Sequence, residues 1–293
     1  MSSTLITVLG WEERFRLGVE INLEKETFSQ LIIVIFKDYF KMKGMKENLS
    51  FLEKIARQKN IESKRIELTY NKSVENWKTL DKFFVSNQDI GNVTLNITTI
   101  PRETIWTLLF FLRKNNQKVE YVYFKPREYT KGWLTKNHKN PRLLFKHSGV
   151  FELNKRLALF IITGFDKLRL RQLIEFYEPD KIVLFCQKGE QYENHLRNNG
   201  FSNSINIPIE HIKIDSYSVA DAKITIKEKI ETNSDYNIIL SSQGPKISSL
   251  STYLCYLECK DQIALSYVPA REFNGAYSTG VDENYISGSL LLS

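Results

Sequence analysis

The sequence repeats one order of predicted strands and helices twice, and this repeat constrains the fold more than any other feature. In the first half, strand-like apolar runs alternate with helix-like segments from Thr4–Leu9 to Val119–Phe124. The second half has the same order from Leu157–Thr163 to Gln262–Val268. Continuous apolar strands separated by helices are typical of a parallel sheet covered on both faces. We therefore predict an α/β protein made of two tandem Rossmann-like halves, each with a doubly wound, mainly parallel sheet, related by internal duplication.

The two halves also match in sequence at three places. The first landmark pairs Gly10-Trp11-Glu12 with Gly164-Phe165-Asp166. The second landmark pairs Thr98-Thr99-Ile100-Pro101-Arg102 with Ser241-Ser242-Gln243-Gly244-Pro245-Lys246. The third landmark pairs Lys125-Pro126-Arg127-Glu128-Tyr129 with Pro269-Ala270-Arg271-Glu272-Phe273. Because the three landmarks occur in the same order, we predict a first half over residues 1–135 and a second over 156–293. The polar residues 136–155 are predicted to form the linker.

Composition excludes several other classes of protein. Over 293 residues, a 42% share of hydrophobic residues supplies enough apolar surface for one large core or two smaller ones, so disorder is not expected. Three cysteines are too few for a disulfide scaffold, and their spacing is not that of a zinc cluster. A net charge of +7 fits an anionic partner without identifying it.

We expect a cytoplasmic protein. The first residues, Met1 to Leu9, form an apolar run without a basic region or a small-residue cleavage site, which favours a first strand over a signal peptide. The apolar runs are much shorter than the roughly 20 residues of a membrane span. The cysteines are expected to be buried and reduced, with a metal or redox role as the alternative.

In this fold class, ligands bind beyond the carboxyl ends of the strands, near the switch in strand order. Gly10 and Gly164 follow the first strand of each half, where a residue without Cβ allows a tight turn and close ligand approach. The helix that follows has free N–H groups at its start, which suit phosphate or carboxylate. Neither GxGxxG nor a P-loop is present, so dinucleotide cofactors and P-loop NTP hydrolysis are disfavoured, and no cofactor is expected.

The second landmark combines hydroxyls with a base. Thr98 and Thr99 in the first half, and Ser241 and Ser242 in the second, are predicted either to cap the following helix or to bind phosphate.

Arg102 and Lys246 then place a cation at a helix N-terminus, where the helix dipole favours an anion. A base in this position in both halves predicts a bound anion. The alternative is an internal ion pair, with Glu13 or Glu103 as the partner of Arg14 or Arg102.

Further bases and aromatic residues follow the last strand of each half. They are Lys125, Arg127 and Tyr129 in the first half, and Arg271, Tyr277 and Ser278 in the second. We expect them on loops at the ligand end of the sheet, where they would hold phosphates and stack on nucleobases. The alternative is that they form a solvated rim. Residues 274–280 are expected to form a flexible loop able to fold over a ligand. We expect Arg14 and Glu13 to order the turn after the first strand.

Catalytic residues are not identified by the sequence. Glu13 and Asp166 are the candidates for an acid or base, and both equally fit the role of helix N-terminal acids that interact with the dipole. The four histidines do not have metal-ligand spacing, so no metal is expected.

The residues Gly10-Trp11-Glu12-Glu13-Arg14, Asn96 to Arg102 and Gly164-Phe165-Asp166 resemble a signature of Rossmann-like bacterial proteins found in anti-phage defence gene clusters. That signature reads Gly-Phe-Glu-Glu-Arg, then Asp-[Ile/Thr]-[Ser/Thr]-x-[Met/Leu/Phe]-Pro-[Arg/Lys]. The resemblance spans nearly the whole chain and carries no assigned chemistry. Trp11 replaces the Phe and Asn96 the Asp, so a catalytic role of that acid would be in doubt here.

A looser resemblance is to the Rossmann-like sensor domains of CRISPR accessory proteins, the CARF class. Its domains bind cyclic oligonucleotides across a two-fold made by two sheets, through a loop that often reads Gly-Thr-Lys before a helix. Residues 242–246, Ser-Gln-Gly-Pro-Lys, are similar to that loop, and the duplication would supply both sheets in one chain.

These observations lead to three hypotheses of different classes. The first is a component of a bacterial anti-phage defence system that binds an anionic nucleotide or nucleic acid. The second is a nucleotide or nucleic-acid hydrolase using Glu13 or Asp166. The third is a scaffold for a neighbouring defence protein.

Overall fold

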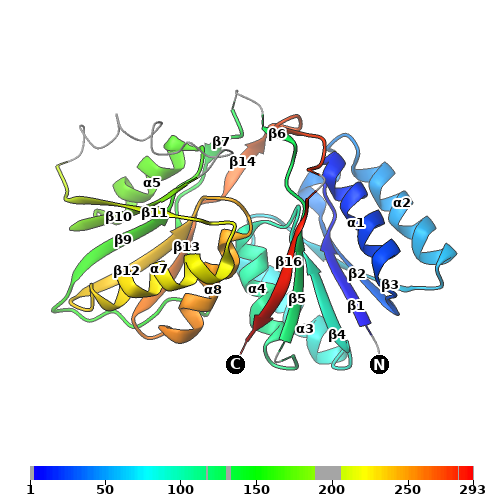
Figure 1. Cartoon of the computed structure of the whole chain (residues 1–293), viewed down its shortest axis with the longest axis horizontal. Helices are drawn as coiled ribbons and strands as arrows, with labels where there is room; N and C mark the ends of the chain where they lie inside the picture. Colours follow the sequence, from blue (N-terminus) through cyan, green and yellow to red (C-terminus); the bar gives the residue numbers. More distant parts are fainter. Residues whose placement is uncertain (1–2, 117, 130–132, 189–205, 283, 293) are drawn as a thin grey trace. The chain divides into compact units, whose positions relative to one another are not determined.

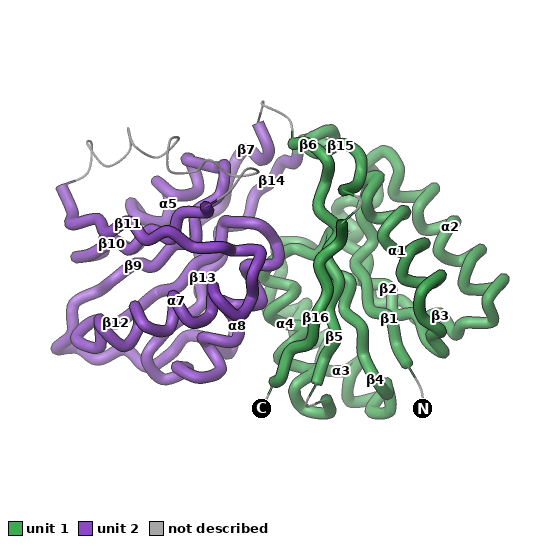
Figure 2. The backbone as a smooth tube through the Cα atoms, viewed as in Figure 1, with its two compact units in different colours: residues 1–132, 274–293 green, residues 133–273 purple. Residues whose placement is uncertain are grey.

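The chain forms two compact units, and the C-terminal segment belongs to the first of them. A computed structural model describes residues 3–116, 118–129, 133–188, 206–282 and 284–292. Unit 1 contains residues 1–132 and 274–293, whereas unit 2 contains residues 133–273 (Figure 2). This division differs from the predicted one, which left 274–293 with the second half and treated 136–155 as a linker. Residues 136–155 belong to unit 2.

Unit 1 is built on a sheet with the strand order β16-β5-β4-β1-β2-β3 (Figure 1). Its strands are β1 (Ser3–Val8), β2 (Gln30–Phe36), β3 (Glu62–Leu68), β4 (Asn92–Asn96), β5 (Lys118–Tyr123) and β16 (Ile286–Leu291). The first five are parallel, and β16 runs antiparallel to β5 at the edge. The order changes direction at β1, so the switch point lies between β1 and β4.

The helices of unit 1 cover both faces of this sheet. They are α1 (Glu13–Lys25), η1 (Lys37–Tyr39), α2 (Met45–Gln58), α3 (Ser73–Ser86) and α4 (Arg102–Leu112). A buried apolar cluster joins α1 and α2 to strands β1 and β2, for example through Phe15, Leu5 and Ile33. Helices α3 and α4 pack against each other, and Phe84 stacks on Phe111 with ring centroids 5.4 Å apart. This two-sided burial explains why the central part of the sheet contains a continuously apolar run such as residues 31–36 of β2.

Unit 2 repeats the same topology. Its sheet has the order β11-β10-β9-β12-β13-β8, with parallel β9 to β13 and antiparallel β8 at the edge. The strands are β8 (Arg142–Leu143), β9 (Arg156–Ile162), β10 (Lys181–Gln187), β11 (Ile209–Ile214), β12 (Tyr236–Ser242) and β13 (Ile263–Tyr267). The helices are α5 (Lys167–Tyr177), α7 (Val219–Glu231) and α8 (Ser248–Glu258). The predicted fold class, two doubly wound and mainly parallel α/β halves, is confirmed.

The segments that follow the last parallel strand of each half are exchanged. After β5, the chain forms β6 (Glu128–Tyr129) in unit 1 and then β7 (Thr135–His138) and β8 in unit 2. After β13, it forms β14 (Ala270–Phe273) in unit 2 and then β15 (Ser278–Thr279) and β16 in unit 1. Strand β15 pairs with β6, and β7 pairs with β14. Each sheet therefore receives its antiparallel edge strand from the segment that follows the other half's last parallel strand.

Two elements predicted between β10 and α7 differ from the observed structure or lie outside it. The strand predicted at Ser204–Ile207 is observed further along the chain as β11, after Pro208. The helix predicted at Gln191–Asn198 lies outside the described residues. Within the described part of the chain, no helix combines the length and apolar character needed to cross a membrane.

Candidate functional site

The first landmark lies at the switch point of each sheet, and its glycine is required by packing. A Cβ at Gly10 would lie 2.7 Å from the Thr99 side chain, which follows β4. In unit 2, a Cβ at Gly164 would overlap the backbone carbonyl of Gln243, which follows β12. The loops after the two central strands therefore touch at the same place in each unit, and only glycine allows this approach.

The hydroxyl pairs make structural hydrogen bonds at this place. Thr98 Oγ1 accepts from the backbone N–H of Phe124 at 3.1 Å, and Thr99 Oγ1 donates to the Val8 carbonyl at 2.7 Å. In unit 2, Ser242 Oγ lies 2.7 Å from Ser248 Oγ at the start of α8. Ser241 is also buried. These bonds join the ends of neighbouring elements, and a phosphate-binding role for the four hydroxyls stays a prediction.

The predicted cations lie at the starts of the equivalent helices. Arg102 is the first residue of α4 and is half-buried. Lys246, also half-buried, lies two residues before the first residue of α8. The first turn of α4 contains Glu103, whereas the first turn of α8 contains no acid. The local potential is therefore more favourable to an anion at α8 than at α4.

Unit 1 contains a buried ion pair directly after β1. Arg14 Nε lies 2.6 Å from Glu12 Oε2, and the two side chains are 1% and 4% exposed. The guanidinium also donates to the Phe124 carbonyl at 3.1 Å and to Tyr277 Oη at 3.0 Å. Arg14 thus pairs with Glu12, and not with Glu13 as the sequence suggested.

The same carboxylate binds the C-terminal segment. Tyr277 Oη donates to Glu12 Oε1 at 2.6 Å, and Ser278 Oγ donates to Glu12 Oε2 at 2.7 Å. Glu13 accepts a hydrogen bond of 3.1 Å from the Gly280 backbone N–H. We call the Glu12, Arg14, Tyr277 and Ser278 group the unit 1 clasp. Residues 274–280 are expected from the sequence to form a flexible loop over a ligand, but Tyr277, Ser278 and Gly280 are hydrogen-bonded to the turn after β1.

The electrostatics of the unit 1 clasp favour its charged form. Burial opposes the charge of Arg14, but the Glu12 carboxylate and the surrounding tyrosines raise its pKa well above the ordinary value. Burial, followed by the Glu12 charge, raises the pKa of Tyr277. Tyr277 therefore stays a neutral donor to Glu12, and Arg14 is a cation whose charge is already compensated within the protein.

Unit 2 has a carboxylate at the equivalent position. Asp166, two residues after Gly164 as Glu12 is after Gly10, accepts from the Thr135 hydroxyl and lies 3.0 Å from His138 Nε2. It also accepts from the Arg169 backbone N–H at 3.3 Å, which caps α5. We call the Asp166, Thr135, His138 and Arg169 group the unit 2 clasp. Thr135 and His138 are the two ends of β7, so this carboxylate too holds an exchanged segment.

The unit 2 clasp does not have the geometry of a hydroxyl–histidine–acid relay. His138 Nε2 faces both Thr135 Oγ1, at 2.8 Å, and Asp166, whereas a relay uses one ring nitrogen for each partner. Burial opposes the Asp166 charge, but hydrogen bonds from His138 and Thr135 and the nearby Arg169 lower its pKa to about 2. A carboxylate held ionised in this way is a poor general base.

The remaining predicted residues lie on or beside the short exchanged strands. Lys125 pairs with Asp282 at 3.0 Å, and Tyr129 stacks near Tyr277 with centroids 6.3 Å apart. Arg127 is exposed, and its backbone N–H bonds to the Thr279 carbonyl. Arg271 is exposed on β14 of unit 2. Of the predicted ligand residues, unit 1 therefore contains Gly10, Arg14, Thr98, Thr99, Arg102 and Tyr277, and unit 2 contains Gly164, Ser241, Ser242, Lys246 and Arg271.

The cysteines are buried and form no disulfide. Burial raises the pKa of Cys186 and Cys259, and that of Cys255 further, which disfavours reactive thiolates. Among the residues that the structure describes, no group of three or more His, Cys, Asp or Glu side chains is placed to hold a metal ion.

Sequence reasoning missed Thr135 and His138 as partners of Asp166. Both lie in the stretch interpreted as a linker, and β7 pairs with β14 more than 130 residues away, as in Phe273 opposite Thr135. The available signal was the repeat itself. An acid two residues after the turn glycine in both halves indicates that both acids have similar surroundings.

Comparisons with known proteins find a likeness of fold but none of sequence. No protein-family model matches the chain, and no curated protein matches it in sequence. A solved structure described as a Type III CRISPR defence DNA nuclease activated by cyclic oligoadenylate aligns with a TM-score of 0.55 at 8% identity, over 96% of this chain and 68% of the nuclease chain. A universal stress protein from Archaeoglobus fulgidus DSM 4304 aligns over 90% of this chain and 97% of its own, but at a TM-score of 0.27 and 10% identity this alignment carries no argument. At 8% identity, the alignment with the defence nuclease shows a shared fold alone.

Proposed function

We propose that this chain is a nucleotide-binding component of a bacterial anti-phage defence system, with an anionic ligand of the cyclic oligonucleotide class. The supporting observation is that a base occupies the start of the equivalent helix in both units, beside the switch point, in a fold shared with a nuclease described as activated by cyclic oligoadenylate. Helix N-termini beside a switch point are common phosphate sites in doubly wound sheets.

In this proposal Arg102 and Lys246 hold ligand phosphates, with the hydroxyls of the second landmark nearby. Arg14 has a different role, because its charge is compensated by Glu12 and its donors are engaged. We assign it to holding the turn after β1 in place. Glu13, which binds the Gly280 N–H, and Asp166, which belongs to the unit 2 clasp, are likewise assigned to the structure of the turns.

Calorimetry with cyclic and linear oligoadenylates tests the proposal. We expect a cyclic form to bind at micromolar concentration or below, and Arg102→Ala with Lys246→Ala to weaken binding at least about tenfold, since each lost charge-assisted contact costs about 1.5–3 kcal/mol. The matched control is Arg113→Ala with Lys260→Ala, which removes the same charge from exposed positions at the other ends of α4 and α8. Equal affinities of the two double variants, or no binding of any oligonucleotide by the wild type, would contradict the proposal.

A further inference from the structure

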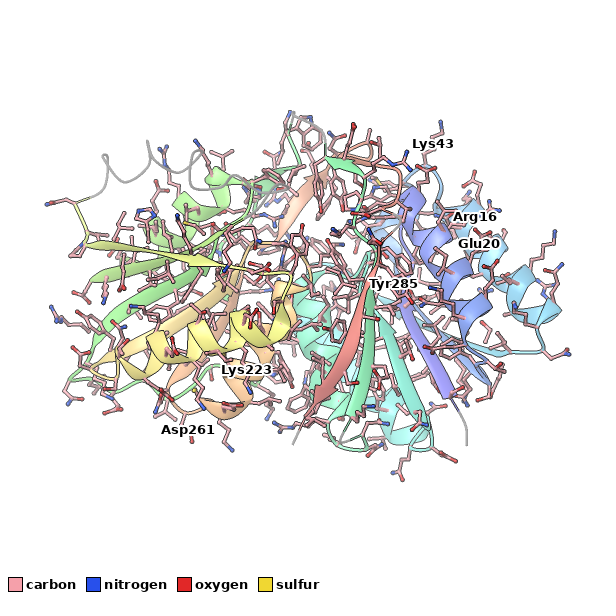
Figure 3. The ribbon with its side chains drawn as sticks, in the orientation of Figure 1. Arg16, Glu20, Lys43, Lys223, Asp261 and Tyr285 are labelled. Carbon is pink, nitrogen blue, oxygen red and sulfur yellow. The ribbon has the colours of Figure 1, made fainter. Side chains whose placement is uncertain are left out.

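The C-terminal segment is held to unit 1 along its length, and two groups of contacts stand beside the Glu13–Gly280, Lys125–Asp282 and β15–β6 contacts described above. Strand β16 pairs along β5, with Ile286 opposite Tyr123 and Leu291 opposite Lys118. Upstream, Tyr277 and Ser278 hydrogen-bond to Glu12. Between these places Tyr285 stacks on Phe124 with centroids 5.1 Å apart, and Lys25 lies over the Tyr285 ring at 4.2 Å (Figure 3 labels Tyr285 at the start of β16).

The segment lies at the edge of the unit, where Leu290 and Leu292 are its buried apolar residues. Strand β16 lies at the sheet edge, and its burial alternates, with Leu290 buried and Leu291 68% exposed. Gly275 and Ala276, upstream of the clasp, are exposed. The apolar cluster between α1, α2 and the sheet contains no residue of this segment. Such edge segments open at a lower free energy than the core does.

Among the upstream contacts, which include the Glu13–Gly280 bond and the Lys125–Asp282 pair, Glu12 is the buried carboxylate. Its two oxygens accept from Tyr277 and Ser278 of the segment and from Arg14. Hydrogen bonds to a buried charge are stronger than neutral ones, and the pair with Arg14 remains when the segment leaves. Opening therefore removes the segment without separating the buried charges.

We propose that residues 277–282 and 284–291 form a releasable strap, locked to unit 1 by the Glu12 carboxylate, which opens while the five parallel strands stay folded. Asp166 is the corresponding lock for residues 135–143 on unit 2. Release of the strap unpairs the edge of β5, so that the sheet passes from a covered edge to one able to pair with a strand of another chain. This inference does not depend on the ligand proposed above.

Hydrogen exchange with mass spectrometry on the full chain tests the strap. Tyr277→Phe with Ser278→Ala removes both donors and leaves the Glu12–Arg14 pair intact, so unit 1 still folds. We expect exchange of residues 286–291 to become about tenfold faster or more, with β1, β2 and β4 unchanged. Glu12→Gln should show the same localised effect if it folds.

The control is Glu20→Gln, which lies on the helix that Glu12 precedes and forms a surface ion pair with Arg16 3.5 Å away. This variant should leave exchange of the strap unchanged. For unit 2, Asp166→Asn should speed exchange of residues 135–143 and leave 286–291 as in the wild type. The proposal would be overturned if residues 286–291 of the Tyr277→Phe, Ser278→Ala variant exchanged at the wild-type rate. It would also be overturned if the exchange rates of β1, β2 and the strap rose equally.

Discussion

A carboxylate two residues after the turn glycine has the same task in both units, but the two units neutralise it differently. In unit 1, Glu12 meets a guanidinium, which stays charged at any ordinary pH. In unit 2, Asp166 meets the imidazole of His138 and the side chain of Arg169. The repeat therefore preserves the position of the acid while its partner changes.

We expect Glu12→Gln to lower the free energy of unfolding by about 3–5 kcal/mol, because it leaves the buried Arg14 charge without its counter-ion. Urea denaturation at pH 7 measures this loss. Glu20→Gln, which breaks the exposed pair with Arg16, should cost less than about 1 kcal/mol. Similar losses in the two variants would show that Glu12 and Arg14 are not buried in solution.

Asp166 makes stability depend on pH in the acid range. Because its pKa is lowered to about 2 in the folded protein and is near 3.9 when unfolded, its ionised form stabilises the fold above pH ~4, by about 2 kcal/mol. That stabilisation is lost as the pH falls from ~4 through ~2. We expect urea denaturation to show a gap of this size between wild type and Asp166→Asn at pH 7, which narrows toward pH 2.5.

The control for this comparison is Asp261→Asn at an exposed position (labelled in Figure 3). Its unfolding free energy should follow that of the wild type at each pH. A gap between wild type and Asp166→Asn that stays constant from pH 7 to pH 2.5 would show that the Asp166 charge does not stabilise the fold.

At the scale of elements, the loops after the central strands of unit 2 are fitted together at Gly164. We expect Gly164→Ala to destabilise by about 3 kcal/mol, since the added Cβ would overlap the Gln243 carbonyl and the backbone must move. Gly275→Ala is the comparison, because its Cβ would meet only Met42, at an ordinary 3.6 Å. Thermal unfolding of the two variants gives the result, and equal melting temperatures would contradict the close approach.

The parallel strands could be predicted from the sequence, whereas the exchanged strands could not. Residues 31–36 of β2 and 182–186 of β10 are continuously apolar because helices cover both faces of their sheets, and this pattern is local. Strand β7, by contrast, is the polar stretch Thr-Lys-Asn-His, and its pairing with β14 spans more than 130 residues. No local pattern contains that information. For the same reason, only part of the candidate site could be predicted. The repeat identified Asp166 but not His138, which lies on β7.

The chain folds into two units. Each unit is completed by a segment that follows the last parallel strand of the other half. A cut in the exposed connection between β8 and β9, where Leu153 is fully exposed, would leave one piece with β7 and β8 and another with β15 and β16. We expect the two pieces to elute together after proteolysis at a site inserted there, because each still completes a sheet of the other.

Size-exclusion chromatography of the cut chain in native buffer checks this, and separation of the pieces would contradict it. The same cut in a chain with Glu12→Gln and Asp166→Asn should give weaker association, because both clasps are then impaired. Denaturant should separate the pieces in every case.

The exchange also sets an order of assembly during synthesis. Unit 2 consists of residues 133–273 alone, whereas unit 1 requires residues that are made after all of unit 2. The half that leaves the ribosome first is therefore the last to be finished. Until the segment with β16 emerges, the edge of β5 has no antiparallel neighbour, and the Glu12 carboxylate lacks two of its hydrogen-bond donors. A nascent chain stalled before residue 274 would thus present an open sheet edge to its neighbours on a polysome.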